Sequence, residues 1–452
     1  GSDAFQETDA IGVTRPIVKH SYMIERPQDI ARIVRQAYYI ASTGRPGVVL
    51  VDVPKNVTFE KAVFEWPETV SIRSYKPTTE GHPKSIQRLA DAIAESKRPY
   101  LYVGGGVVMA NASDHLLELV NKTNIPVTTT LMALGAFPGT HPLFAGMPGM
   151  HGSKLANICF QECDLVIAVG ARFDDRVTGK LSAFAPKAKI AHVDIDPSSI
   201  KKTVKVDYPV VGDAHWVLRE LNKVVKPRQP NEWNRTFAEM KETHWFRYRP
   251  STEVMRPQYV IEKIYEMTKG DAIISTEVGQ IQMWAAQFYK FDKPRRWLTS
   301  GGLGTMGYGF PAAIGAQFAA PDAMVIDIAG DGSIQMNIQE LTTVVENRLP
   351  VKVVILNNGY LGMVRQWQEF FYDRHYSSSV IGGLPDFAKV ADAFGAKGLT
   401  ARTHDDVVPV LEEGLAHPGP VFMDFHINPE ENVFPMVPAG KALDEMQEEE
   451  WA

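Results

Sequence analysis

Short apolar runs that end at glycine, aspartate or asparagine recur along this chain, separated by stretches with helical periodicity. Runs of this length, rich in β-branched residues and closed by such residues, are typical of buried strands. Strands that alternate with helices build parallel βαβ units. The pattern therefore predicts an α/β fold made of consecutive doubly wound parallel sheets. The clearest expected strands lie at 45–57, 100–106, 164–175, 189–197, 271–280, 323–332 and 351–359.

The chain is too long for one core, because it has 452 residues. Two polar stretches rich in proline, at 74–85 and 223–235, are candidate linkers. They predict three parts: residues 1–73, residues 80–225 and residues 245–452.

Composition narrows the function classes. Hydrophobic residues make up 44% and charged residues 22%, as in ordinary soluble enzymes. The formal net charge is -6, and no basic face or long apolar run is visible, so neither nucleic acid nor a membrane is expected as a partner. Cys159 and Cys163 lie one helical turn apart without a second pair, which favours two reduced thiols over a zinc site.

The segment that starts at Gly330 predicts one complete βαβ unit. An apolar strand ends at Asp331, and a second apolar strand ends at Asn357 and Asn358. Between them a single helix is expected, because four apolar residues share one helical face. Both strand ends should then lie at the carboxyl edge of a sheet, where open α/β sheets bind ligands. The four apolar residues are Ile334, Ile338, Leu341 and Val345.

The residue types at these strand ends suit a metal–diphosphate complex. Asp331 offers a carboxylate and Asn358 an amide oxygen, both hard donors that Mg²⁺ accepts. Gly330 and Gly332 let a phosphate approach the backbone, and the following helix adds free N–H groups. Either motif alone is also compatible with a simple tight turn. Their occurrence together, each at a strand end, favours the socket.

The pairing of GDG with NN resembles the thiamin-diphosphate motif of the pyruvate-decarboxylase-like superfamily. Segments 170–180, 278–287, 301–317 and 359–372 narrow the resemblance. They are similar to the catalytic subunit of acetohydroxyacid synthase (acetolactate synthase), and the similarity extends over essentially the whole chain. The family carries thiamin diphosphate, Mg²⁺ and a structural FAD that does no net redox work.

The resemblance implies a site for thiamin diphosphate and its metal. The metal ligands would be Asp331, Asn358 and the main-chain carbonyl of Tyr360. Met306, Gln280 and Met363 would be catalytic, with Met306 bending the cofactor so that its aminopyrimidine acts as base. From spacing alone, Met306 is equally an ordinary core methionine. The implied cofactor contacts are Val278, Gly279, Gln280, Gly304, Met306, Gly330, Gly332, Ser333, Leu361, Gly362 and Met363.

The resemblance also implies an FAD site, chiefly in the middle part. Physical reasoning agrees in part, because glycines after a strand admit a pyrophosphate and arginines neutralise it. Taken alone, the GGG run and residues 174–176 could equally be surface loops. The implied contacts are Phe5, Arg45, Gly104, Gly105, Gly106, Thr130, Leu131, Met132, Met147, Gly149, Met150, His151, Gly170, Arg172, Asp174, Arg176, Val177, Asp194, Ile195, Asp213, Gly301 and Gly302.

The implied reaction is decarboxylative carboligation, the first common step of branched-chain amino-acid synthesis. Pyruvate loses carbon dioxide, and its two-carbon remainder joins a second pyruvate or 2-ketobutyrate to give 2-acetolactate or 2-aceto-2-hydroxybutyrate. A cation beside the acceptor carboxylate is chemically sensible, and an indole can select the acceptor by shape. The implied substrate residues are Lys55, Arg176, Met150, Val364 and Trp367, with Phe5, Met363 and Ala439 nearby.

Two departures from the family stand out. Ile281 occupies a position where the family commonly has histidine, so a polar cofactor contact from that side chain is not expected. The glutamate that activates the cofactor belongs to a segment before Gly1, so we expect the chain to be N-terminally incomplete and slow or inactive alone. Glu7, Glu25 and Glu60 do not have the context to replace it.

The resemblance finally implies a homodimer or larger homo-oligomer, a small regulatory subunit, and a cytoplasmic location, or an organelle stroma or matrix in a eukaryote. No transit peptide is visible in these residues. Two rival functions stay open. One is another thiamin enzyme, such as a pyruvate oxidase or a simple keto-acid decarboxylase, and the other is a non-catalytic nucleotide-binding fragment.

Overall fold

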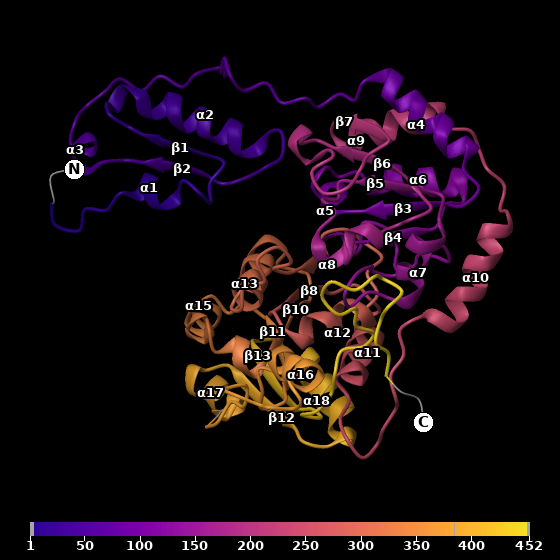
Figure 1. Cartoon of the computed structure of the whole chain (residues 1–452). Helices are drawn as coiled ribbons and strands as arrows, with labels where there is room; N and C mark the ends of the chain where they lie inside the picture. The colour runs from indigo at the N-terminus through magenta and orange to yellow at the C-terminus, as the bar shows by residue number, and fades with distance from the viewer. Residues whose placement is uncertain (1–3, 384, 450–452) are drawn as a thin grey trace.

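The computed structural model describes residues 4–383 and 385–449. These residues form three sheets, of two, five and six strands, and every strand pair within them is parallel. Figure 1 shows the three sheets with helices around them. The predicted α/β fold of consecutive parallel sheets is therefore confirmed.

The two-stranded sheet belongs to the first part of the chain, which stands apart at the left of Figure 1. Its own core is small, with Ile24, Ile33 and Val57 buried together. Its elements are α1 (Ala10–Thr14), β1 (His20–Met23), α2 (Ile30–Ser42), β2 (Val49–Asp52) and α3 (Lys55–Thr58). The expected strand at 45–57 is thus limited to four residues.

The five-stranded sheet has the order β4-β3-β5-β6-β7. Its strands are short and buried, as expected for a parallel sheet covered on both faces. They are β3 (Pro99–Val103), β4 (Val127–Thr129), β5 (Leu165–Val169), β6 (Lys189–Asp194) and β7 (Tyr208–Val211). The main helices around it are α4 (Pro83–Glu95), α5 (Gly105–Met109), α6 (Ser113–Thr123), α7 (Lys154–Glu162), α8 (Asp175–Thr178), α9 (Ala214–Val224) and α10 (Glu232–His244).

The six-stranded sheet has the order β12-β13-β11-β10-β8-β9. Its strands are β8 (Ile273–Thr276), β9 (Trp297–Leu298), β10 (Val325–Gly330), β11 (Lys352–Asn357), β12 (Lys397–Ala401) and β13 (Val421–His426). Its helices are α11 (Pro257–Thr268), α12 (Gln280–Phe288), α13 (Gly309–Ala319), α14 (Asp331–Ile334), α15 (Leu341–Glu346), α16 (Gly362–Phe371), α17 (Phe387–Phe394) and α18 (Val407–Ala416).

Both large sheets reverse their winding direction beside their first strand in sequence. In the five-stranded sheet the chain leaves β3 toward β4 on one side and continues from β5 on the other. In the six-stranded sheet it leaves β8 toward β9 and continues from β10. Ligands of doubly wound sheets bind outside the carboxyl ends of the strands at such a reversal. The fold therefore predicts ligand sites at the carboxyl ends of β3 and β5 and at those of β8 and β10.

One continuous apolar core joins the two large sheets. Phe137, from the five-stranded part, and Phe291 and Trp297, from the six-stranded part, belong to the same buried cluster. A main-chain hydrogen bond also joins the two parts, because the Gly139 N–H donates to the Phe291 carbonyl at 2.9 Å. The two sheets are thus held in a fixed mutual arrangement, whereas the division at residues 1–73, 80–225 and 245–452 stays a prediction.

The single helix expected after Ser333 is wrong. The chain forms α14, then a turn of 3₁₀-helix at Ile338–Glu340, then α15. Asn337 adopts a non-helical φ of -136°, and its Nδ2 donates to the Gly307 carbonyl at 2.6 Å. The tertiary hydrogen bond therefore overrides the helical periodicity, and it fastens the segment to the loop that carries Met306.

The linkers and the cysteines also have a place in the fold. Helix α4 begins at Pro83, and α9 ends at Val224, so each expected linker includes a few helical residues. Cys159 and Cys163 are both buried and free. Among the described residues, no helix is long and apolar enough to span a membrane.

We predict opposite effects for one chemical change at two glycines. Gly398→Ala should destabilise the protein by about 1–3 kcal/mol, because the new Cβ would lie 2.1 Å from the Ala388 carbonyl of α17. Gly315→Ala should stabilise it by about 0.5–1 kcal/mol, since the site is in α13 with no atom within 4 Å. Urea unfolding measures both, and a stable Gly398→Ala variant would contradict the close packing of β12 on α17.

Candidate cofactor and active site

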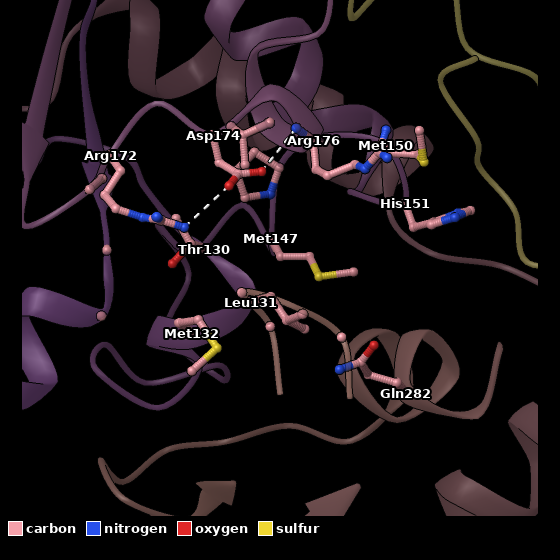
Figure 2. A pocket seen from close by; sticks show the side chains of 18 of the residues that line it. Thr130, Leu131, Met132, Met147, Met150, His151, Arg172, Asp174, Arg176 and Gln282 are labelled. Carbon is pink, nitrogen blue, oxygen red and sulfur yellow. Dashed lines mark hydrogen bonds and ion pairs between the residues drawn. The ribbon is translucent and has the colours of Figure 1, made fainter. Parts of the chain in front are cut away.

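A cavity of about 350 Å³ opens at the carboxyl ends of β3 and β5. It brings together most of the residues that the sequence analysis assigned to FAD (Figure 2). These are Gly104, Gly105, Thr130, Leu131, Met132, Met147, Met150, His151, Gly170, Arg172, Asp174, Arg176, Val177, Gly301 and Gly302. Met363, Gly304 and Trp367, assigned to the other cofactor and the substrate, also line it.

Charged and apolar side chains both line the cavity, as Figure 2 shows. Arg172 forms an ion pair with Asp174 at 3.3 Å, and the Arg176 N–H donates to the Asp174 carboxylate at 3.0 Å. Leu131 and Met147 are among the apolar residues. A large ligand with an anionic group and a flat apolar ring system fits this combination.

Two further features fit a dinucleotide. Tyr102 lines the cavity, and its buried hydroxyl has no hydrogen-bond partner among the described residues; a ligand acceptor brought close to Tyr102 would satisfy it. A Cβ on Gly104 would lie 2.1 Å from the Gly170 carbonyl. The two strand ends therefore approach as closely as glycine alone allows, which leaves backbone exposed to a pyrophosphate. The residues present fit FAD.

Other predicted FAD residues lie elsewhere. Gly106, Gly149, Asp194, Ile195, Asp213, Phe5 and Arg45 do not line the cavity. Asp194 ends β6 on the same edge of the sheet, and Asp213 caps α9 by accepting from the His215 and Trp216 N–H groups. Arg45 reaches toward this end of the edge, 3.9 Å from Asp196. These residues could meet a ligand only if it extends along the edge from β3 to β7.

A second group of predicted residues converges at the carboxyl ends of β8, β10 and β11. A Cβ on Gly332 would lie 3.0 Å from the Leu361 side chain and 4.0 Å from that of Met306. A Cβ on Gly362 would meet the Gln280 and Asn358 side chains. Helices α12 and α16 begin here, at Gln280 and Gly362. The first N–H groups of a helix have no partner within that helix, so those of α12 and α16 are available to an anion bound among these residues.

The candidate metal ligands lie within this second group. Asp331 is buried and accepts from the N–H groups of Gly332 at 2.9 Å and Gly359 at 2.7 Å. Burial nevertheless raises the pKa of Asp331 to about 6, so a nearby cation would stabilise the carboxylate. Asn358 Oδ1 accepts from the Tyr360 N–H at 3.0 Å. One carboxylate and one amide oxygen fit Mg²⁺ that is completed by phosphate.

The remaining predicted residues of this group have defined surroundings. A Cβ on Gly304 would lie 3.7 Å from Val278, which joins these two residues across the loop. Gly330 and Ser333 share hydrogen bonds around the start of α14. Ile281 is buried beside Gly330, so its side chain supplies apolar packing there.

The predicted substrate residues divide between two places. Trp367 and Val364 are partly exposed on α16, and Trp367 lines the cavity. Ala439 borders a small hollow together with Met150 and Arg176. Lys55 and Phe5 belong to the first part of the chain and do not line the cavity.

Sequence reasoning missed a buried acid pair beneath the second group. Glu277 is fully buried and accepts from the N–H groups of Gly307 and Phe310, at 2.5 and 3.1 Å. Asp327 is also fully buried, accepts from the Ser275 hydroxyl at 3.0 Å, and has an unpaired Oδ2. Burial raises the pKa of both carboxyls, and each disfavours the other's charge. The available signal was an acidic residue inside one apolar strand, Asp327 in β10, and another directly after a neighbouring strand, Glu277 after β8.

Comparison with known proteins agrees with this geometry. Residues 277–425 match the thiamine pyrophosphate enzyme C-terminal TPP binding domain, and residues 86–221 match the thiamine pyrophosphate enzyme central domain. The chain is 45% identical to acetolactate synthase isozyme 3 large subunit of Escherichia coli, over 99% of this chain and 80% of that protein. It is 46% identical to acetolactate synthase of Mycobacterium bovis, over 99% and 74%.

The chain belongs to the acetolactate synthase family. Acetolactate synthases are thiamine pyrophosphate (thiamin diphosphate) enzymes, and the matched TPP binding domain contains the second group of residues. The match to the central domain covers the strands whose ends form the large cavity. The family expectation from the sequence is confirmed, while the role of each site residue stays a prediction.

We predict that Asp327→Asn raises the thermal midpoint more at pH 8 than at pH 5. The folded pKa values of Asp327 and Glu277 are raised, so wild-type stability falls as pH rises above the unfolded value of about 4. Asparagine keeps an acceptor for Ser275 and removes one of the two charges. A gain of about 2–4 °C at pH 8, as about 1 kcal/mol produces in a domain of this size, should shrink at pH 5. An equal gain of the Asp327→Asn variant over the wild type at pH 5 and at pH 8 would contradict the prediction.

Proposed function

We propose that this member of the acetolactate synthase family joins the two-carbon remainder of pyruvate to a second 2-keto acid. The reaction would take place where the large cavity meets the group of residues around Asp331, Asn358 and Gln280. The observation that carries the proposal is that Met363 and Gly304 belong to the cofactor group and also line the large cavity. A reacting centre at this junction would be reached from both sides. The products would be 2-acetolactate or 2-aceto-2-hydroxybutyrate.

The second group of residues would hold thiamin diphosphate and Mg²⁺. Asp331, Asn358 and the Tyr360 carbonyl would bind the metal, and the N–H groups at the starts of α12 and α16 would receive the diphosphate. When bound, thiamin diphosphate supplies a nucleophilic carbon and a sink for the electrons that decarboxylation releases. Met306 lies close to Gly332, where its side chain would pack against the cofactor.

The large cavity would hold FAD in a structural role. Arg172 would neutralise its phosphates, Tyr102 would donate a hydrogen bond, and the methionines would cover its rings. Binding of a ligand this large would also order the walls against which the acceptor keto acid packs.

The acceptor would meet residues that orient it and exclude water. Arg176 offers a cation for the acceptor carboxylate, and Trp367 presents a partly exposed indole at the cavity. Exclusion of water favours attack on a second keto acid over simple protonation. The role of Arg176 would be positioning, and that of Trp367 would be selection by shape.

Partners follow from the relatives and from the residues that do not reach the cavity. Several relatives are named large subunits, so we infer a small regulatory subunit for this chain as well. A homo-oligomer would bring Lys55 and Phe5 of one copy to the cavity of another, since neither lines it within one chain.

A simple keto-acid decarboxylase is the rival that shares this cofactor chemistry. It would use Asp331 and Asn358 in the same way, but it has no need for an indole and a cation around an acceptor. The presence of Arg176 and Trp367 at one cavity favours the synthase.

We predict acetolactate as the main product. The protein, supplied with thiamin diphosphate, Mg²⁺ and FAD, should convert pyruvate to acetolactate and carbon dioxide, detected by a colorimetric assay and by carbon-13 NMR. The same preparation should retain flavin absorbance after gel filtration. Acetaldehyde as the main product would support the decarboxylase instead.

We predict that Trp367→Leu weakens acceptor selection. When pyruvate and 2-ketobutyrate compete, the ratio of the two products should shift toward acetolactate by about tenfold, which is the scale of one methylene in a shaped pocket. Chromatography of the product mixture measures the ratio, and total carbon dioxide release controls for damage to the first half-reaction. An unchanged ratio with unchanged turnover would remove Trp367 from acceptor selection.

A further inference from the structure

Two glutamine side chains lie buried behind the candidate metal ligands and form a directed chain of hydrogen bonds. Gln366 Oε1 accepts from the Val433 N–H at 2.8 Å and from Gln280 Nε2 at 2.8 Å. Gln280 Oε1 in turn accepts from Asn358 Nδ2 at 3.3 Å. Gln280 and Gln366 are 3% and 0% exposed, so water has little access to replace these contacts.

The direction of this chain is fixed at its origin. An amide has one end that donates and one that accepts, so each amide in a row dictates the orientation of the next. The Val433 N–H can only donate, which turns Gln366 Oε1 toward it, and Gln366 Nε2 donates to the Val433 carbonyl at 3.2 Å. The Glu431 carbonyl accepts from Gln280 Nε2 at 2.9 Å. Gln280 must therefore direct its oxygen at Asn358.

The backbone that starts the chain is itself held firmly. Arg365 is buried and donates to the Glu431 carbonyl at 3.0 Å and to Asn432 Oδ1 at 2.5 Å. The Glu431 side chain forms an ion pair with Arg256 and accepts from Gln258 Nε2 at 2.8 Å. Segment 431–433 is therefore a rigid anchor with almost all of its polar groups in use.

We propose that Gln280 and Gln366 are positioning residues that force Asn358 to present its amide oxygen to the metal. Asn358 Nδ2 is committed to Gln280, and Asn358 Oδ1 accepts from the Tyr360 N–H, so the second lone pair of Oδ1 is left for Mg²⁺. If Gln280 were reversed, two donors would face each other and Asn358 would turn its NH₂ group toward the cation. The proposal rests on the proposed function, because it assigns the metal to this site.

The proposal gives the Gln280 side chain a role distinct from direct contact with the diphosphate. Its oxygen and both N–H directions that the structure records are used within the protein: the oxygen by Asn358, and Nε2 by Gln366 and Glu431. Contact with a phosphate is left to the Gln280 main-chain N–H at the start of α12. Two explanations for any effect of Gln280 on cofactor binding can therefore be separated.

The first test is Gln280→Met, which keeps the length of the side chain and removes its polar atoms. The change leaves no buried acceptor alone, because Gln366 Oε1 keeps Val433 and the Glu431 carbonyl keeps Arg365. The Mg²⁺ concentration for half-maximal thiamin diphosphate binding, followed by tryptophan fluorescence, should rise about tenfold, the usual effect of losing an outer-shell partner. Gln366→Met should have a smaller effect in the same direction, since the Glu431 carbonyl still orients Gln280.

The decisive test repeats Gln280→Met in an Asn358→Asp background. A carboxylate presents oxygen in either orientation, so the orienting contact is no longer needed, and Gln280 Oε1 now faces a negative charge. The loss of Mg²⁺ affinity caused by Gln280→Met should therefore disappear or reverse in this background. An equal tenfold loss in both backgrounds would overturn the proposal, because it would mean direct phosphate contact or general packing.

Two controls separate other failures. Gln368→Met changes the same residue type on α16, the helix that also carries Gln366. Gln368 donates to the Ser377 carbonyl, and its replacement should leave the Mg²⁺ dependence unchanged. The thermal midpoint without cofactors reports folding of every variant. If the wild-type protein binds thiamin diphosphate without any dependence on Mg²⁺, the proposed function fails at that point, whereas normal wild-type binding with an unaffected Gln280→Met variant overturns the orienting role alone.

Discussion

The site depends on the close approach of strand ends at the two reversals of winding. Gly104 and Gly170 meet with no room for a Cβ, and so do Gly309 and the backbone at Thr276–Glu277. Such approaches bring main-chain N–H groups of neighbouring segments to one edge, where they face a ligand instead of each other. Because one apolar core fixes the two large sheets mutually, the two edges can serve as walls of the single site proposed above.

This arrangement leaves charges buried that the protein alone does not neutralise. Asp331 is surrounded by N–H donors, yet its pKa is raised to about 6 by burial. Glu277 and Asp327 lie together under the same edge, and in the part of the chain that the structure describes their hydrogen bonds come from main-chain N–H groups and the Ser275 hydroxyl. In the proposed site the charge of Asp331 would be matched by the bound cation, whereas Glu277 and Asp327 are accommodated by retention of a proton. Burial of these carboxyls lowers the stability of the fold, and such a cost is common where the buried groups serve a binding site.

The sequence predicted the strand ends well and the side-chain networks poorly, for physical reasons. Asp331 and Asn358 end apolar runs, and a parallel sheet sends all such ends to one edge, so their convergence follows from topology. The helix after Ser333 failed because Asn337 is held by Gly307, a contact that periodicity cannot encode. Gln280 and Gln366 are far apart in sequence, and their pairing depends on where segment 431–433 returns to the sheet.

Amides suit the task of orienting a metal ligand better than charged groups do. A carboxylate at Gln280 or Gln366 would keep only the accepted hydrogen bonds, because it cannot donate to Gln366, Glu431 or Val433 as the amides do. It would also add a negative charge whose burial costs several kcal/mol and which would change the site's affinity with pH. A fully satisfied amide conveys direction through its dipole at no net charge. In the proposed site the metal end would then keep one carboxylate, Asp331, and leave the remaining negative charge to the diphosphate. Neutral relays behind a cation site are therefore expected wherever the bound substrate or cofactor supplies the anion itself.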